Sequence, residues 1–332
     1  MTTFKEIRGT AIRSVSSDPS NPEEGQIWYN NTIGVLKGYD GTLAAWAAGG
    51  NMGTARYFFA GAGTQTAGLG FGGLTTVNSN ATEEYDGAAW AAGGNLTTAR
   101  QGIAGCGTQT AGLGFGGFTT AVTTATEEYN GSTWGPGGNM GTARYGSGGA
   151  GTQTAGLGFG GRFATPGAVT NATEEYDGSV WTGGGNMATA RRILGGCGIQ
   201  TAGLAFGGFD GTNSLNSTEE YDGSTWTAGG NMGTGRNSNA GAGTQTAGLA
   251  FGGSVPPDSA ATEEYNGSAW TNSTNMTTAR RGLAGCGTQT VGLAFGGYTT
   301  AVSTATEEFT GAFLSAKKIT TSEHDNIQRN FW

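Results

Sequence analysis

The sequence predicts an all-β propeller built from four-stranded blades, and three observations carry that prediction. A tryptophan recurs at intervals of 44, 44, 47, 45 and 44 residues, and the arginine of each "AR" or "GR" pair recurs with the same period. A period in the mid-forties is typical of four-stranded blades and also of paired-helix repeats. Glycine supplies 67 of the 332 residues and interrupts every repeat, which excludes helices. The repeated residues are Trp46, Trp90, Trp134, Trp181, Trp226 and Trp270, with Arg56, Arg100, Arg144, Arg191, Arg236 and Arg280.

Each repeat is expected to contain four short strands, which we call a, b, c and d in chain order. In the repeat that starts at Arg100 they are "RQGIAGCG", "TAGLGFGG", "ATEEY" and "STW". Asn130-Gly131 separates c from d, and such dipeptides favour a tight hairpin because both turn positions need positive φ. The "GTQT" segment is interpreted as the a–b turn, since no lysine follows it as in a phosphate-binding loop.

The phrase "EEYDGSTW" and its near-copies are interpreted as scaffold. Side chains alternate along strand c, so one glutamate shares the face of the tyrosine and the other faces away. A buried carboxylate needs a cation or hydrogen bonds, and the repeated arginine is the expected partner. Each tryptophan is expected to bury on the order of 150–250 Å² between neighbouring blades.

The order of these signals resembles the kelch motif: a Gly-Gly doublet closes b, an aromatic residue in c precedes a DG-type turn, and a tryptophan lies in d. The resemblance covers residues 26–332 and implies a β-propeller. The doublets are Gly72-Gly73, Gly116-Gly117, Gly160-Gly161, Gly207-Gly208, Gly252-Gly253 and Gly296-Gly297.

Seven blades are favoured over six. The segments "GQIWYN", "GVLKGYD" and "LAAW" are expected to form strands b, c and d of one further blade, and residues 324–332 its strand a. This N-terminal and C-terminal blade would close the ring and remove its open edges. Cysteines alternate with alanines at one repeat position, which implies three duplicated pairs and keeps six blades as the alternative: Cys106, Cys197 and Cys286 against Ala62, Ala150 and Ala242. Residues 1–25 are expected to be an anchoring arm, and 26–332 the propeller.

No catalytic or metal site is expected, and no cofactor. The only histidine is His324, the three cysteines are expected to be buried free thiols, and glutamates spread evenly around a ring cannot converge as an acid pair. The formal net charge of −8 argues against nucleic acid as a partner. No run approaches the roughly 20 apolar residues of a membrane span, so membrane insertion is not expected.

Function is expected where the repeats differ, which is in the b–c loops. These loops vary in length and content, as in "RFATPGAVTN", "FDGTNSLN", "SVPPDSA" and "YTTAVST". Antiparallel order places the b–c loops and d–a turns on one face, and both termini on the opposite one. The candidate ligand-binding or partner-binding residues are Arg162, Phe163, Phe209, Asp210, Asn213, Asp258 and Tyr298.

The N-terminal stretch suggests a setting. "FKEIRGTAIRSVSSDPSNPEEGQIWYNNTIGVLKGYDG" resembles the start of tail-associated structural proteins of marine tailed bacteriophages. The resemblance implies a virion protein, made in the bacterial cytoplasm, that acts as a tail fibre, tip or capsid-surface appendage and recognises a host surface glycan or protein. The expected partners are other virion proteins through residues 1–25, that host receptor, and further copies of the chain. The alternative is a purely structural virion module that binds no receptor.

Overall fold

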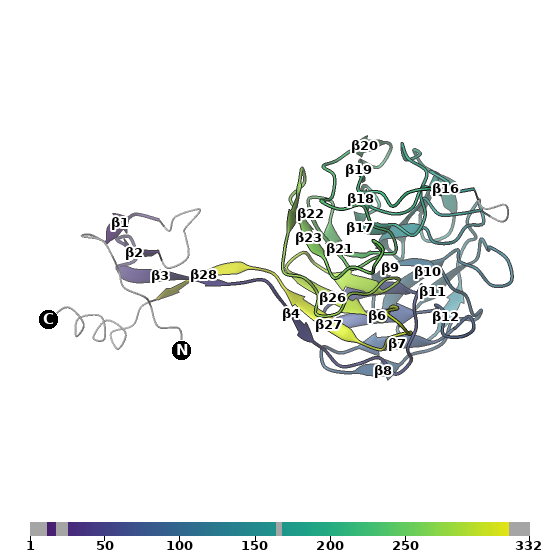
Figure 1. Cartoon of the computed structure of the whole chain (residues 1–332), viewed down its shortest axis with the longest axis horizontal. Coiled ribbons are helices and arrows are strands. Elements are labelled where there is room, and N and C mark those ends of the chain that lie inside the picture. The colour runs from purple at the N-terminus through teal and green to yellow at the C-terminus, as the bar shows by residue number, and fades with distance from the viewer. Residues whose placement is uncertain (1–11, 18–25, 164–167, 319–332) are drawn as a thin grey trace. The chain divides into compact units, whose positions relative to one another are not determined.

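In the part of the chain that the structure describes, the regular structure is entirely β. The computed structural model describes residues 12–17, 26–163 and 168–318, and every regular element in these ranges is a strand (Figure 1). The strands form seven four-stranded sheets, so the all-β prediction and the predicted number of sheets are confirmed. The chain divides into two compact units, Ala45–Thr310 and a smaller unit made of Met1–Ala44 with Gly311–Trp332.

The larger unit contains six sheets, numbered here as blades 1 to 6, each with its strands in the order a, b, c, d. Blade 1 is β5 (Ala60–Thr64), β6 (Ala67–Phe71), β7 (Thr82–Tyr85) and β8 (Trp90–Ala92); blade 2 is β9 (Ala104–Thr108), β10 (Ala111–Phe115), β11 (Thr126–Tyr129) and β12 (Trp134–Pro136); blade 3 is β13 (Gly148–Thr152), β14 (Ala155–Phe159), β15 (Thr173–Tyr176) and β16 (Trp181–Gly183). Blade 4 is β17 (Gly195–Ile199), β18 (Ala202–Phe206), β19 (Thr218–Tyr221) and β20 (Trp226–Ala228); blade 5 is β21 (Ala240–Thr244), β22 (Ala247–Phe251), β23 (Thr262–Tyr265) and β24 (Trp270–Asn272); blade 6 is β25 (Ala284–Gly287), β26 (Val291–Phe295), β27 (Thr306–Thr310) and β4 (Ala45–Ala48).

These six blades close on themselves as a propeller. Each a strand contacts the a strand of the next blade around the centre, and β25 of blade 6 contacts β5 of blade 1 (Figure 1). Trp90 donates a hydrogen bond to Thr306 across the closing junction (2.9 Å). The ring therefore has six blades, the number kept as the alternative, and the seventh four-stranded sheet belongs to the smaller unit.

The closing strand differs from the expected one. Residues Ala45–Ala48 do not form strand d of a seventh blade; they pair with β27 of blade 6, where Trp46 lies opposite Phe309. The physical reason is that "TEEF" at 306–309 is followed by Thr310-Gly311 and no tryptophan, so this c strand lacks a d strand of its own. Trp46 fills the vacant position. The strand a expected at 324–332 lies outside the described residues.

The smaller unit holds one sheet that combines both ends of the chain. Its order is β1 (Arg13–Val15), β2 (Ile27–Asn30), β3 (Val35–Thr42) and β28 (Phe313–Lys318), with β1 and β2 parallel and the other pairs antiparallel. Trp28 is fully buried within it. The N-terminal strands β2 and β3 thus share a sheet with a C-terminal strand, but that strand is Phe313–Lys318 and pairs with β3, whereas the expected strand was 324–332, next to strand b. The boundary expected at residue 25 falls inside this unit.

Six buried Arg–Glu ion pairs recur, one in each blade. The first glutamate of every "TEE" or "TEEF" segment pairs with the repeated arginine, as predicted, and the arginine side chains are completely buried. Burial lowers the pKa of Arg56 to about 10, and the neighbouring Glu83 opposes that shift, so the guanidinium stays charged at neutral pH. The pairs are Arg56–Glu83, Arg100–Glu127, Arg144–Glu174, Arg191–Glu219, Arg236–Glu263 and Arg280–Glu307.

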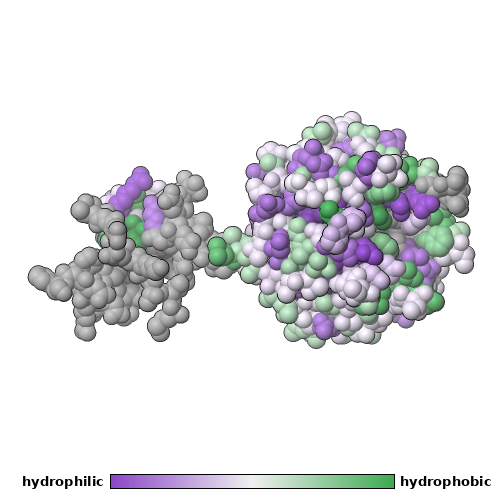
Figure 2. Space-filling view, in the orientation of Figure 1, coloured by the Kyte–Doolittle hydropathy of each residue, from purple (hydrophilic) through white to green (hydrophobic). Residues whose placement is uncertain are grey.

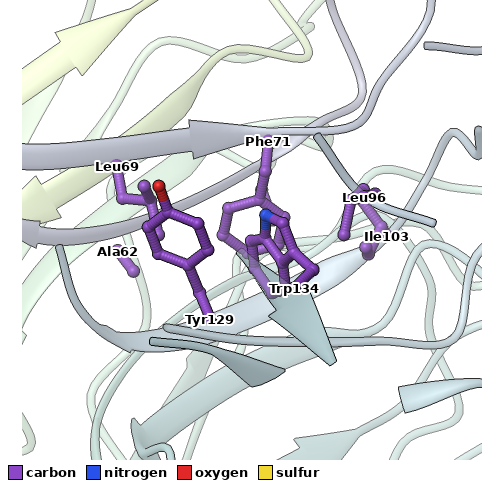
Figure 3. Packing of buried hydrophobic residues seen from close by; sticks show 8 residues of the cluster. Ala62, Leu69, Phe71, Leu96, Ile103, Tyr129 and Trp134 are labelled. Atoms are coloured by element: carbon purple, nitrogen blue, oxygen red, sulfur yellow. The ribbon is translucent and has the colours of Figure 1, made fainter. Parts of the chain in front are cut away.

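A second set of contacts joins neighbouring blades. Each tryptophan indole donates to the first threonine of strand c in the preceding blade, as Trp134 does to Thr82 (2.9 Å). Each glutamine of the a–b turn donates to two backbone carbonyls of the preceding blade, as Gln109 does to Gly68 and Tyr85. Leu69 and Phe71 of blade 1 pack against Tyr129 and Trp134 of blade 2 (Figure 3). The "GTQT" repeat is therefore both a turn and an inter-blade clamp.

The second glutamate of each pair also acts between blades, with one informative exception. Tyr129 donates to Glu84 of the preceding blade at 2.5 Å, and burial with this contact raises the pKa of Tyr129 to about 12. Four further tyrosines make the same bond: Tyr85, Tyr176, Tyr221 and Tyr265. In the sixth case Phe309 has no hydroxyl, and Glu264 accepts instead from Ser273, which stands where the other blades have glycine.

The three cysteines behave as predicted. Cys106, Cys197 and Cys286 are free and buried, and desolvation raises the pKa of each thiol to about 12. They alternate around the ring with the three alanines at the equivalent position. Within the described ranges, no helix is long and apolar enough to cross a membrane.

We expect Arg100→Met to lower the free energy of unfolding by about 3–5 kcal/mol, because it leaves the Glu127 carboxylate buried without its cation. Guanidinium unfolding measures this loss. Adding Glu127→Gln to the same chain should restore part of it. A loss below about 1 kcal/mol, the value of an exposed pair, would contradict this account.

We expect Gly93→Ser and Tyr129→Phe to be coupled. A Cβ at Gly93 would lie 2.8 Å from the Tyr129 hydroxyl, so the serine alone clashes, whereas the double variant reproduces the natural Ser273–Glu264–Phe309 arrangement. The double variant should be more stable than the sum of the single losses predicts, by about 0.5–3 kcal/mol in a double-mutant cycle. Additive losses would refute the proposed equivalence.

Candidate functional site

The segment after each repeated arginine builds the centre of the b–c face. Three residues separate the arginine from strand a, and their letters differ in every blade: "YFF", "QGI", "YGS", "RIL", "NSN" and "RGL". The first of the three forms a β-bridge with the first residue of its own b–c loop, which anchors that loop. These bridges are Tyr57–Leu74, Gln101–Phe118, Tyr145–Arg162, Arg192–Phe209, Asn237–Ser254 and Arg281–Tyr298.

The second of the three residues forms a closed ring of six backbone hydrogen bonds. Each N–H donates to the carbonyl of the equivalent residue in the preceding blade, over 2.6–2.8 Å. All six have positive φ, which glycine adopts readily but Phe58, Ile193 and Ser238 adopt only with strain. The members in ring order are Phe58, Gly102, Gly146, Ile193, Ser238 and Gly282. This ring frames the mouth of the central channel.

A cavity of about 340 Å³ lies at this mouth. Its wall includes Phe58, Phe118, Tyr145, Arg192 and Asn239, which come from five different blades. A smaller cavity of about 110 Å³ shares its deeper residues and is lined mainly by the glycine-rich starts of the a strands. The volume of the outer cavity is at the lower end of the roughly 300–1,000 Å³ typical of small-molecule sites.

Some arginines of the ring do not belong to the buried Arg–Glu pairs, and these lie around this mouth. Residues 45–310 contain nine arginines and no lysine, and six of the arginines belong to the buried pairs. The other three are Arg162, Arg192 and Arg281, all on the b–c face, and each guanidinium lies over an aromatic ring at 4.7–5.8 Å. The b–c face therefore presents three guanidinium groups that are stacked on aromatic side chains.

The three arginines differ in their other partners. Arg162 donates to the Tyr145 hydroxyl (2.9 Å), and Nη1 of Arg281 donates to both carboxylate oxygens of Asp258 (2.8 and 2.9 Å). Arg192 stacks on Phe209, and no carboxylate pairs with it in the described part of the chain. Of the three arginines, Arg192 is thus the one whose guanidinium can bind an external anion.

The candidate loop residues surround the cavity without lining it. Arg162, Phe209 and Tyr298 form the bridges and cation–π pairs of the rim, and Asp258 holds Arg281. Asp210 accepts from the N–H groups of Thr212 and Asn213, which shapes the loop and lowers the pKa of Asp210, and Asn213 itself is exposed. Phe163 is half-buried beside the undescribed residues 164–167.

Sequence reasoning missed the residues that line the cavity. The available signal was the variation of the three residues between each constant arginine and strand a, which contrasts with the constancy of the flanking residues. The sequence-based prediction placed the binding residues in the b–c loops instead, because the length of these loops varies. Only the structure shows that these short segments meet at the centre of the ring.

The opposite end of the ring carries a different charge. Its c–d turns contain Asp86, Asp177 and Asp222, and each carboxylate accepts from two backbone N–H groups of its own turn. These bonds lower the pKa of Asp222 to about 2. Asn130 and Asn266 make the same turn in two other blades. Figure 2 shows polar and apolar residues interspersed over the visible side of the ring, without one dominant apolar area.

Among the described residues, no group of three or more histidine, cysteine, aspartate or glutamate side chains is placed to hold a metal ion. No model of a protein family matches the chain, and no curated protein matches it.

We expect Gly102→Ala to lower the free energy of unfolding by about 1–2 kcal/mol, because Gly102 holds φ +57° in the hydrogen-bonded ring. Thermal or chemical unfolding measures the change. Gly135→Ala is the control, since its φ is ordinary and an added Cβ meets nothing within 4 Å. Equal stability of the two variants would contradict the strain assigned to the ring.

Proposed function

We propose that this protein is a bacteriophage virion component whose propeller binds a host surface receptor through its b–c face. The observation that carries the proposal is the concentration of Arg162, Arg192 and Arg281, with their aromatic partners, around a cavity on the one face where the repeats differ. Buried contacts are nearly identical in all blades, so selection for stability alone does not explain that divergence.

The chain path supports a display role for this face. The ring begins at Ala45 and ends at Thr310, and both points lie at the c–d end of blade 6, because strand d starts where strand c ends. The b–c loops lie at the other end of the strands. The chain therefore enters and leaves the ring at the end opposite the variable loops.

The virion setting rests on the N-terminal resemblance to tail-associated proteins. In this proposal, the segment up to residue 25 attaches the chain to other virion proteins, as a tail fibre, tip or capsid-surface appendage. The kelch-like order of signals in the blades is consistent with a binding propeller that has no catalytic centre. The competing role is a structural module that buries the b–c face against its neighbours.

Binding of the fluorescently labelled chain to cells of the host bacterium tests the proposal. The triple variant Arg162→Gln, Arg192→Gln, Arg281→Gln should reduce cell binding at least about tenfold, because it removes the cations of the face. The matched control is Asp86→Asn, Asp177→Asn, Asp222→Asn at the opposite end, where asparagine already serves in blades 2 and 5.

Unchanged binding of the control and loss by the arginine variant would support receptor recognition. Equal binding by all three proteins would contradict it. Absence of cell binding by the wild-type chain, with the b–c loops buried in a cryo-EM map of the virion, would establish the structural role instead.

A further inference from the structure

The channel-mouth cavity holds a buried polar side chain that has no partner. Asn239 is only 5% exposed, and neither its Oδ1 nor its Nδ2 has a hydrogen-bond partner. Four other blades place Phe59, Ile103, Leu194 or Leu283 at this position, all buried and apolar. An unsatisfied buried amide is costly, so its presence among apolar equivalents points to a ligand that supplies the missing bonds. One amide offers both a donor and an acceptor, which suits a hydroxyl.

Among the described residues that line the cavity, Arg192 alone is charged. No carboxylate lines the cavity, and Arg192 has no ion-pair partner in the residues that the structure describes. Its stacking on Phe209 at 5.3 Å holds the planar guanidinium in place while leaving its N–H groups for an acceptor. A fixed guanidinium fork of this kind fits the two oxygens of a carboxylate.

Two aromatic rings form another part of the cavity lining. Phe118 and Tyr145 both line the cavity, and their ring centroids lie 5.8 Å apart. The C–H face of a sugar ring packs on such surfaces, because doing so removes apolar area from water while the hydroxyls remain at the ring edge. Gln101 and Ser147 add polar groups beside these rings. The volume of about 340 Å³ suits one or two sugar units.

We propose that this cavity binds a terminal acidic sugar, with the carboxylate on Arg192, hydroxyl groups on Asn239, and the ring face against Phe118 and Tyr145. The proposal deepens the receptor-binding function above and rests on it for its biological meaning. Its chemistry stands on the cavity alone, because one cation, one unpartnered amide and an aromatic wall together select a pyranose that bears one negative charge.

Glucuronic acid is the probe, with glucose as the counterpart that lacks the carboxylate and glycolate as the one that lacks the ring. Saturation-transfer NMR and calorimetry on the full chain should show binding of glucuronic acid, with glucose and glycolate at least about tenfold weaker. Equal affinity for glucose, or no saturation transfer to glucuronic acid, would overturn the proposal.

Two variants locate the site. Arg192→Gln should weaken glucuronic acid at least about tenfold and change glucose little. Asn239→Leu should weaken both sugars yet raise the melting temperature, because leucine occupies the equivalent place in two other blades. Asn239→Ser, the residue of blade 3, serves if the leucine variant does not fold. Affinities unchanged in these variants would place the sugar elsewhere and refute the site.

The same variants separate this inference from the proposed function. If Arg192→Gln and Asn239→Leu keep cell binding while the triple arginine variant loses it, the face binds a receptor but the acidic-sugar site is wrong. If glucuronic acid binds with the predicted variant effects and no cell binding occurs, the site stands and the host-recognition function fails.

Discussion

The rest of the molecule depends on the buried Arg–Glu pair that recurs in each blade. Arg56, for example, contacts Glu83 on strand c and the carbonyls of Gly70 and Ala81, which lie on either side of the b–c loop. One side chain thus fixes where strand b ends and strand c begins. The second and third residues after each arginine line the cavity at the channel mouth, so the same anchor also positions the candidate site. The cost is six guanidinium Nε groups that are buried without partners.

Repetition separates the stabilising positions from the variable ones. The tryptophan, tyrosine and glutamine of each blade reach back to the preceding blade, so their chemistry is fixed by contacts that recur around the ring. Phe309 departs from that rule next to the point where the chain leaves the ring, and Ser273 compensates for it. At the channel mouth the six copies share the hydrogen-bonded backbone ring with its positive φ, but their side chains differ, as Phe59, Ser147 and Asn239 do at one equivalent position.

Much of this fold could be predicted from sequence because it rests on local signals. Turn dipeptides, the Gly-Gly doublets and the period define the strands, and the need to neutralise a buried carboxylate identifies the arginine partner. Local signals could not predict which strand closes the ring, because the pairing of Trp46 with Phe309 joins residues more than 260 positions apart. The missing tryptophan after "TEEF" was the one local clue. The cavity could not be predicted either, since Arg192 and Asn239 line one cavity only because the ring closes.

A crystal structure of the full chain with glucuronic acid tests the central claim, that a uniform scaffold presents one binding site at its variable mouth. The account predicts a sugar whose carboxylate contacts Arg192 and whose hydroxyl groups satisfy Asn239. A sugar bound at another place, or a cavity in which ordered water alone satisfies Asn239 at saturating sugar, would contradict it.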